Sequence, residues 1–315
     1  MSAPRLPAWS STALRIAVSV AALAIVLARV PLRDVGHAFA TLDPLWTLAA
    51  FGAVFAAIGI SAVKWRMLLR ARGYSIPLQR VLRHYFVGLF FNNFLPTSVG
   101  GDVVRAWDAG RDIDDAPEGA ASVIAERLVA SLALGLTAAI GLPFVTAGAQ
   151  ATLAVAVVIA ASVGLVALFL APARAESMMA KAMGGRFEGV ADWVARAVKG
   201  VRETLRRTRT VLVVLALSVA FQVLVALVNF AIFRALGVAV SVGSCIVYTS
   251  VISAVTMVPI SISGHGVREA GYVYFFGLAG VTAGVAVTAS LLFFAIVALS
   301  TLPGALLFAI DRKRA

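Results

Sequence analysis

Two arginines stand at matching places in apolar parts of the sequence, and their chemistry suits a phosphate group. Arg105 follows Pro96 at the same distance as Arg268 follows Pro259. A guanidinium group keeps its charge in a partly dry site, and its planar fork binds two phosphate oxygens at once. We therefore predict that both arginines engage an anionic lipid headgroup. The alternative is that internal ion pairs with Asp102, Glu126 and Glu269 neutralise the two arginines. Both can hold if the substrate phosphate exchanges with the carboxylate.

Glu126 and Arg127 are adjacent ionisable residues within the apolar stretch 119–142. An ionisable side chain at membrane depth costs at least ~2.5 kcal/mol and usually faces the interior of a helix bundle. Both residues are therefore candidates for the substrate site. Two roles are open for Glu126, which is either a proton-coupling group or the counter-ion that orients Arg105.

Polar residues beside the two prolines complete the candidate site. Asn92 and Asn93 precede the first proline, where they could bind the ligand or cap a helix end. His265 could relay a proton, although a lone histidine is more often structural. Because no Ser/His/Asp, Cys/His or HExxH set accompanies it, we expect a transporter with no catalytic residue, cofactor or metal. The predicted substrate-binding residues are Arg105, Arg268, Asn92, Asn93, Asp102, Glu126, Arg127, His265 and Glu269.

Proline and glycine residues interrupt two apolar regions, 84–107 and 244–278. Proline removes a backbone donor and glycine permits unusual backbone angles, so a helix should break and restart in each region. Non-helical backbone at membrane depth must face protein or a water-filled cavity. The alternative is a loop outside the membrane. The expected break residues are Pro96, Gly100, Gly101, Pro259, Gly264 and Gly266.

The overall composition indicates a membrane protein. Hydrophobic residues make up 61% of the 315 positions, 13% are charged, and the mean hydropathy is +0.96. These values exclude an ordinary soluble domain. The net charge of +12 does not indicate a nucleic-acid partner, because basic residues gather after alternate hydrophobic segments, as they do in cytoplasmic loops. We expect a multi-pass protein of the inner (cytoplasmic) membrane with both termini in the cytoplasm, and basic clusters at Lys64–Arg83, Arg174–Arg209 and Arg312–Arg314.

The predicted fold class is an all-α polytopic membrane protein. A helix of about 20 apolar residues crosses ~30 Å of hydrocarbon. About six segments are expected to span, and the two interrupted regions are expected to form broken re-entrant hairpins. The predicted spans are 13–30, 45–64, 119–142, 150–171, 209–234 and 281–309.

The two halves of the sequence resemble each other at a shift of 163 residues, the separation of the two prolines. The same shift carries 45–64 onto 208–227 and 119–142 onto 282–305. One extra span lies between the matched helices, so the second half should enter the membrane in the opposite sense, as in transporters with inverted repeats. We expect one membrane domain, 1–315, with a first repeat at 45–142, a connecting helix and cytoplasmic amphipathic loop at 150–208, and a second repeat at 209–309.

The amphipathic loop has apolar residues at helical spacing and basic residues on its other faces. This pattern predicts an interfacial helix against anionic headgroups, and a solvated connector helix is the alternative. The apolar positions are Phe187, Val190, Val194, Val198, Val201 and Leu205.

Three motifs, in this order, resemble the flippase-like family typified by the transmembrane region of lysylphosphatidylglycerol synthases. They are Gly88–Arg105 (GLFFNNFLPTSVGGDVVR), Ala125–Leu128 (AERL) and Pro259–Glu269 (PISISGHGVRE). The resemblance covers roughly residues 11–310 and implies a protein that moves lipids between leaflets. In bifunctional relatives an aminoacyl-transferase domain follows, whereas this sequence ends at Ala315. The family usually has glycines where Ser263 and His265 stand, so headgroup preference is expected to differ.

Three functions follow as hypotheses. The first is a flippase or transporter for an anionic phospholipid or a polyprenyl-phosphate-type lipid, moved through a central cavity; a glycolipid is also open. The second is an intramembrane enzyme that modifies a lipid headgroup, with Glu126, Asp102 or His265 as acid or base. The third is a non-transporting partner of a separate lipid synthase. The partners expected are membrane lipids with phosphate headgroups, and a homodimer and a separate lipid-modifying enzyme are left open.

Overall fold

The computed structural model describes residues 42–94, 99–145, 148–170, 188–257 and 264–312, and the regular structure within these ranges is helical. Five helical stretches in this part of the chain are long and apolar enough to cross a membrane. They match five of the six predicted spans, and the sixth, 13–30, lies outside the described residues. The stretches are α3 (Pro44–Ala71), α6 (Ala116–Gly141) with η1 (Leu142–Phe144), α7 (Ala149–Leu170), α10 (Thr208–Ala235), and α13 (Ala283–Thr301) with α14 (Pro303–Arg312).

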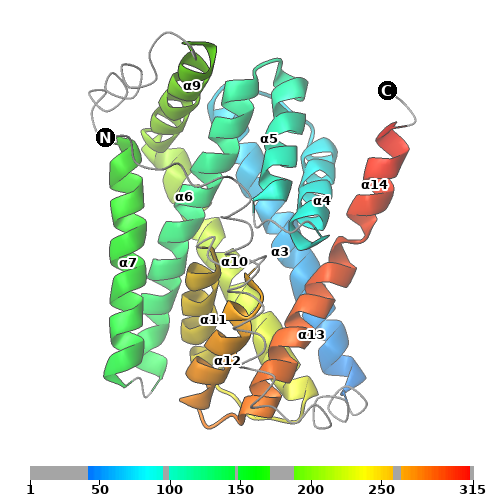
Figure 1. Cartoon of the computed structure of the whole chain (residues 1–315), viewed down its shortest axis with the longest axis vertical. Coiled ribbons are helices and arrows are strands. Elements are labelled where there is room, and N and C mark those ends of the chain that lie inside the picture. Colours follow the sequence, from blue (N-terminus) through cyan, green and yellow to red (C-terminus); the bar gives the residue numbers. More distant parts are fainter. Residues whose placement is uncertain (1–41, 95–98, 146–147, 171–187, 258–263, 313–315) are drawn as a thin grey trace, which may run out of the picture.

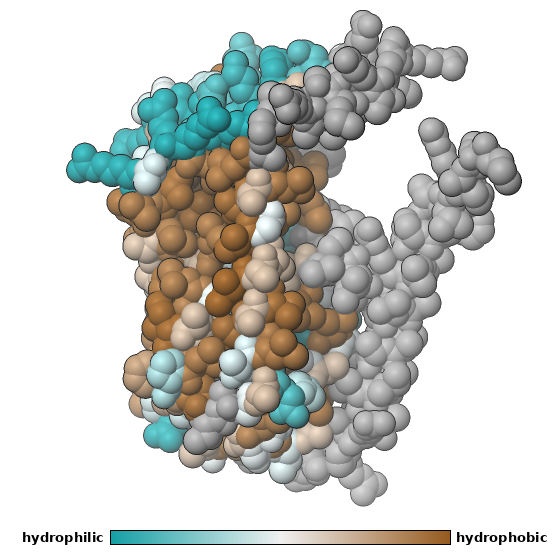
Figure 2. Space-filling model, turned by 90° about the vertical axis from the view of Figure 1, so that its left-hand side faces the viewer, coloured by the Kyte–Doolittle hydropathy of each residue, from teal (hydrophilic) through white to brown (hydrophobic). Residues whose placement is uncertain are grey.

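The surface of the bundle is apolar around its middle. Figure 2 shows a broad hydrophobic band between more polar ends, on the side where α7 lies in Figure 1. On α7, Leu153, Val157 and Leu168 are all more than half exposed. Exposed apolar area costs roughly 25 cal/mol per Å² in water, but lipid tails remove that cost. The chain is therefore a multi-pass membrane protein.

The sequence marks the starts of two spanning helices by acidic caps and prolines. The Asp43 carboxylate accepts hydrogen bonds from the backbone N–H groups of Leu45 (2.8 Å) and Trp46 (3.3 Å) at the start of α3. Asp115 accepts from the N–H of Glu118 (3.2 Å) at the start of α6. Each helix has a proline at its first or second position, where a missing N–H costs nothing. These caps fix where each span begins.

Each interrupted region folds into two short helices that pack against each other. The first pair is α4 (Leu78–Phe94) and α5 (Gly100–Ile113), and the second is α11 (Val242–Met257) and α12 (Val267–Gly277). In Figure 1 the first pair lies in the upper half of the bundle and the second pair in the lower half. The two pairs therefore approach the middle of the bundle from opposite ends.

The glycines at the two breaks do different things. Gly264 and Gly266 have φ angles of 76° and 81°, which side chains rarely adopt, as expected for a broken helix. In the first half the helix was expected to break and restart next to Gly100 and Gly101, and α5 begins at Gly100, so it restarts at these glycines and not after them. Both prolines, Pro96 and Pro259, lie outside the described residues.

Gly101 is a packing residue. A Cβ atom there would lie 2.6 Å from the carbonyl carbon of Gly88, and closer still to its oxygen. A Cβ on Gly88 would in turn lie 2.5 Å from Cγ of Arg105. The two glycines therefore bring the backbones of α4 and α5 into contact and set the place of Arg105.

The amphipathic loop contains a helix, α9 (Glu188–Leu205). Val201 is fully buried and packs in a cluster with Ala121 and Leu128 of α6. Side chains of Arg196 and Lys199 are more than half exposed. A helix is thus present from Glu188 to Leu205, and its apolar face partly packs against the bundle. Its placement at the membrane interface stays a prediction, and Phe187 lies outside the described residues.

An ion-pair cluster ties α9 to the ends of α3 and α6. Arg72 donates to both carboxylate oxygens of Glu118, at 2.7 and 3.1 Å, and to the carboxylate of Glu203. The hydrogen bond from Arg72 lowers the pKa of Glu203, and the hydrogen bond to Glu118 raises the pKa of Arg72. These three residues connect helices that are distant in sequence.

Acidification is expected to loosen α9. Because the pKa of Glu203 is depressed by Arg72, the pair stabilises the fold above the unfolded pKa of about 4.3, and this is lost as pH falls through the lower folded value. Glu203 is partly exposed, so solvent screening limits the effect to about 1 kcal/mol or less. Hydrogen exchange of α9 amides, corrected for intrinsic rate, should rise several-fold from pH 7 to pH 3. In Glu203→Gln exchange should already be raised at pH 7, and equal protection of wild type at both pH values would contradict the role of this pair.

Candidate functional site

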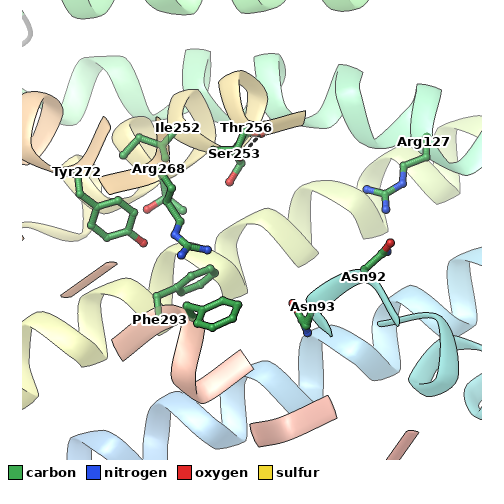
Figure 3. Close-up of a pocket in the computed structure, with 11 residues that line it drawn as sticks. Asn92, Asn93, Arg127, Ile252, Ser253, Thr256, Arg268, Tyr272 and Phe293 are labelled. Carbon is green, nitrogen blue, oxygen red and sulfur yellow. Dashed lines mark hydrogen bonds between the residues drawn. The ribbon is translucent and has the colours of Figure 1, made fainter. Parts of the chain in front are cut away.

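The ends of the two helical pairs surround a cavity of about 230 Å³. Asn92 and Asn93 reach it from the end of α4, Arg268 from the start of α12, and Arg127 from α6. Figure 3 shows Arg127 and Arg268 on opposite sides of this cavity. Serine, threonine and tyrosine hydroxyls form part of the wall, from Thr249, Ser253, Thr256 and Tyr272.

A second cavity, of about 270 Å³, adjoins the first. Arg127, Ser253 and Phe293 line both. Most of the second cavity is apolar, and its charged side chains gather together. They are Lys64, Arg105, Glu126 and Arg127.

Arg105 is held by several contacts at once. Its guanidinium group pairs with the carboxylate of Glu126 and lies 3.7 Å from that of Asp102. The same group lies over two aromatic rings, 4.5 Å from the centroid of Trp65 and 4.2 Å from that of Tyr85. Only 2% of the residue is exposed. The internal ion pair that the sequence left open as an alternative is therefore present.

Glu126 is the acceptor at the centre of this cluster. It lies ten positions after Ala116, the first residue of α6, which is a rise of about 15 Å along a helix long enough to cross the membrane. Its carboxylate also accepts a hydrogen bond from the hydroxyl of Tyr85 at 3.3 Å. Glu126 is 4% exposed. This depth explains why the neighbouring cations are required, because an isolated carboxylate there would be unstable.

Arg127 belongs to a different pair. Its Nε and Nη2 atoms donate to the two oxygens of Asp102, at 2.8 and 3.0 Å. This is the bidentate geometry that arginine forms with a carboxylate. The Arg127 side chain remains 43% exposed although Asp102 is largely buried. Of Arg105 and Arg127, the two paired arginines that line the second cavity, Arg127 is thus the one that keeps an accessible face.

Lys64 is a site residue that the sequence analysis misplaced. It was counted with the cytoplasmic basic cluster, but it lies inside α3, is 2% exposed, and lines the second cavity. Its Nζ atom lies 3.8 Å from Glu126 and 4.8 Å from the ring centroid of Phe221. The burial of Lys64 could have been predicted by continuing the helical periodicity of residues 45–64 to residue 71. Lys64 falls three positions after Ser61, on the same buried face of α3.

The second half contains a smaller polar network around Arg268. Its guanidinium group donates to Glu269 at 2.9 Å and to the hydroxyl of Ser290 at 3.1 Å. Glu269 is fully buried and also accepts from the backbone N–H of Gly266 at 2.6 Å, which caps α12. His265 Nδ1 lies 3.4 Å from Arg268. The pairing of Arg268 with Glu269 was also foreseen as an alternative.

The asparagines connect parts of the site. Asn92 accepts a hydrogen bond from the N–H of Gly101 at 2.8 Å, so it caps the start of α5. Asn93 donates to the hydroxyl of Thr301 at 3.1 Å, which links α4 to α13. Both still line the first cavity. The capping role was one of the two alternatives for these residues.

The structure brings the predicted residues together differently from the sequence-based scheme. Arg105 and Arg268 were expected to meet in one pocket, yet Arg105 lines the second cavity and Arg268 the first. Arg127 joins the two cavities and faces Arg268. Arg105 and Arg268 line different cavities because they occupy different positions in their helices. Arg105 is the sixth residue of α5, whereas Arg268 is the second of α12.

Comparison with known proteins places this architecture in a family. The model of the lysylphosphatidylglycerol synthase transmembrane region matches residues 12–304. The chain belongs to this family. All three sequence motifs and both cavities of this synthase-type membrane region lie within the matched residues.

A curated relative of this family member is a UPF0104 membrane protein of Methanothermobacter thermautotrophicus. It is 28% identical over 117 residues, and the match covers 36% of this chain and 35% of that protein. The similarity to this relative therefore spans about a third of each chain. The name of that relative describes it as a membrane protein and gives no activity.

Proposed function

We propose that the protein is a lipid flippase or transporter that moves an anionic phospholipid, or a polyprenyl-phosphate-type lipid, across the cytoplasmic membrane. The observation that carries the proposal is a pair of adjoining polar and apolar cavities within an apolar bundle, with Arg127 and Arg268 at the polar one. Membership of the synthase transmembrane-region family supports it. Acyl chains stay in the bilayer in this scheme.

The phosphate is proposed to bind between Arg127 and Arg268. Each guanidinium has a carboxylate partner that the phosphate can replace in part, so binding exchanges one charge-assisted hydrogen bond for another. The Thr249 hydroxyl lines this cavity, is buried, and has no hydrogen-bond partner among the described residues. Arg105 supports the site by holding Glu126. Such balanced exchange keeps binding weak enough for release.

An inverted repeat is proposed as the basis of alternating access. A shift of 163 residues carries α4, 78–94, onto 241–257, and α11 runs from Val242 to Met257. The same shift carries α3 onto 207–234, where α10 covers Thr208–Ala235. We propose that the two short-helix pairs are re-entrant hairpins related by this repeat, and that rocking of the halves opens the site to each side in turn.

The membrane orientation is proposed from the charge distribution. The end of the bundle that carries α9 also carries the end of α3, where Arg66, Arg70 and Arg72 cluster. Basic residues favour the cytoplasmic side. We therefore place the α4–α5 hairpin on the cytoplasmic side and the α11–α12 hairpin on the outer side.

Reconstituted protein is expected to move fluorescent phosphatidylglycerol across phosphatidylcholine liposomes, and Arg268→Ala should slow it by about ten- to a hundredfold. The loss follows from a charge-assisted hydrogen bond of about 1.5–3 kcal/mol, at 1.4 kcal/mol per tenfold change. The measurement is the rate at which label becomes accessible to a membrane-impermeant quencher. Arg196→Ala, on the exposed face of α9, is the matched control and should transport at the wild-type rate.

Two results would count against this function. Transport that survives the combined Arg127→Ala and Arg268→Ala substitutions would show that these groups do not bind the phosphate. A chemically altered lipid, detected by mass spectrometry of the recovered liposomes, would instead favour an intramembrane enzyme.

A further inference from the structure

The charged groups around the two cavities form three matched pairs and leave one lysine over. Arg105 pairs with Glu126, Arg127 with Asp102, and Arg268 with Glu269. The chain segments at 95–98 and 258–263 contain no charged residue. Among the described residues that line the cavities or pair with those that do, Lys64 is thus the cation in excess.

Lys64 is a weak partner of Glu126. The distance of 3.8 Å from Nζ to the carboxylate exceeds that of a hydrogen bond. Glu126 is already engaged by Arg105 and by Tyr85. A second, fully charged cation beside Glu126 would be uncompensated in a buried site, which is strongly unfavourable.

The groups around Lys64 leave few ways to remove the excess positive charge. The groups that face Lys64 are Glu126 and Arg127 on α6, Arg105 on α5, Tyr85 on α4 and the Phe221 ring on α10; α13 has no ionisable residue. The arginines keep their charge at any pH that a protein tolerates, whereas a lysine ammonium can release a proton. Lys64 is therefore the group whose protonation can balance the site.

His265 does not alter this count. Its Nδ1 faces Nη2 of Arg268 at 3.4 Å, and a guanidinium group can only donate. Nδ1 must accept, so the imidazole is neutral in this arrangement. The second-half pair of Arg268 and Glu269 is then balanced by itself.

We infer that Lys64 exchanges a proton each time an anionic lipid binds, so that the transported lipid carries a single phosphate charge and moves together with a proton. With empty cavities Lys64 is a neutral amine. When the phosphate enters, hydronium or a buffer acid in the cavity water gives a proton to the Nζ lone pair, so one O–H bond breaks, one N–H bond forms, and the conjugate base stays in solution. Release of the lipid reverses the step and returns the proton to water.

This inference rests on the proposed function and narrows its substrate. One phosphodiester charge and one ammonium charge cancel, so the occupied and empty sites have the same net charge. A pyrophosphate lipid would bring more negative charge than Lys64 can balance, and a neutral glycolipid would bring none. Phosphodiester lipids are therefore the class that fits.

Proton uptake on binding provides the test. Purified protein in detergent and weak buffer near pH 7 is titrated with fluorescent phosphatidylglycerol, with binding followed by anisotropy and protons by an indicator dye. Wild type should take up about one proton for each lipid bound, as linkage between the two events requires. Lys64→Arg, which cannot release a proton, should bind lipid with an uptake near zero. Lys199→Arg, the same change on the exposed face of α9, should behave as wild type.

Each other outcome decides against the inference. Lipid binding by wild type without proton uptake, or equal uptake in Lys64→Arg, overturns it and leaves the transporter proposal standing. If Lys64→Arg does not fold, Lys64→Met takes its place in the test. The methionine variant should also bind lipid without proton uptake. Absence of phosphatidylglycerol binding overturns both proposals. Binding with proton uptake but no movement in liposomes overturns transport, and with it the joint movement of lipid and proton, and leaves the coupling of binding to protonation of Lys64 standing.

Discussion

Glu126→Gln should lower the free energy of unfolding by about 3–5 kcal/mol, because removing one member of a buried ion pair leaves the other charge uncompensated. Arg105 would still lie over the rings of Trp65 and Tyr85, and Asp102 at 3.7 Å would be its remaining carboxylate partner. The Arg105 guanidinium group cannot lose its proton, so deprotonation cannot remove the uncompensated charge. Thermal unfolding in detergent measures the change as a lower midpoint temperature.

A matched control separates the effect of breaking a buried ion pair from the effect of removing any carboxylate charge. Asp192 forms an exposed pair with Arg196 at 3.2 Å on α9. Exposed pairs contribute about 0–1 kcal/mol, so Asp192→Asn should leave the midpoint nearly unchanged. Equal effects of the two substitutions would mean that the Arg105 and Glu126 pair does not stabilise the bundle.

Gly101→Ala is expected to destabilise the fold by about 3 kcal/mol or more, the upper range for overpacking. The added Cβ would lie 2.6 Å from the carbonyl carbon of Gly88, closer still to its oxygen, and 2.8 Å from Asn92 Cγ. Backbone atoms cannot rotate away, so α4 and α5 must separate, and Arg105 would lose its position. Transport and the unfolding midpoint should therefore fall together.

Gly52→Ala is the control for this substitution. Gly52 lies within α3, and an added Cβ would meet nothing within 4 Å. Alanine is favoured over glycine inside a helix by about 1 kcal/mol, so the midpoint should stay or rise. A similar loss in both variants would show that glycine is needed for helix flexibility and not for the contact of α4 with α5.

The spanning helices could be predicted from sequence because length and apolar composition decide them. Five predicted spans match helices, with most ends within three residues, whereas α3 continues to Ala71, seven residues beyond the predicted end at 64. The position of the second break could also be predicted, because Gly264 and Gly266 adopt backbone angles that other residues avoid. Gly101 was misread, since a glycine chosen for close packing looks the same in sequence as one chosen for a turn.

By itself, the sequence of this protein determined the membrane class, the spans, the interrupted regions and the set of ionisable residues within them, because the energy of placing each side chain in lipid depends on its type. Only the tertiary structure decided which charges pair and which cavity each residue lines. Arg127 rather than Arg105 faces Arg268, and Lys64 is buried rather than cytoplasmic. Pairing depends on distances of a few ångströms between different helices, and these distances follow from how the helices pack.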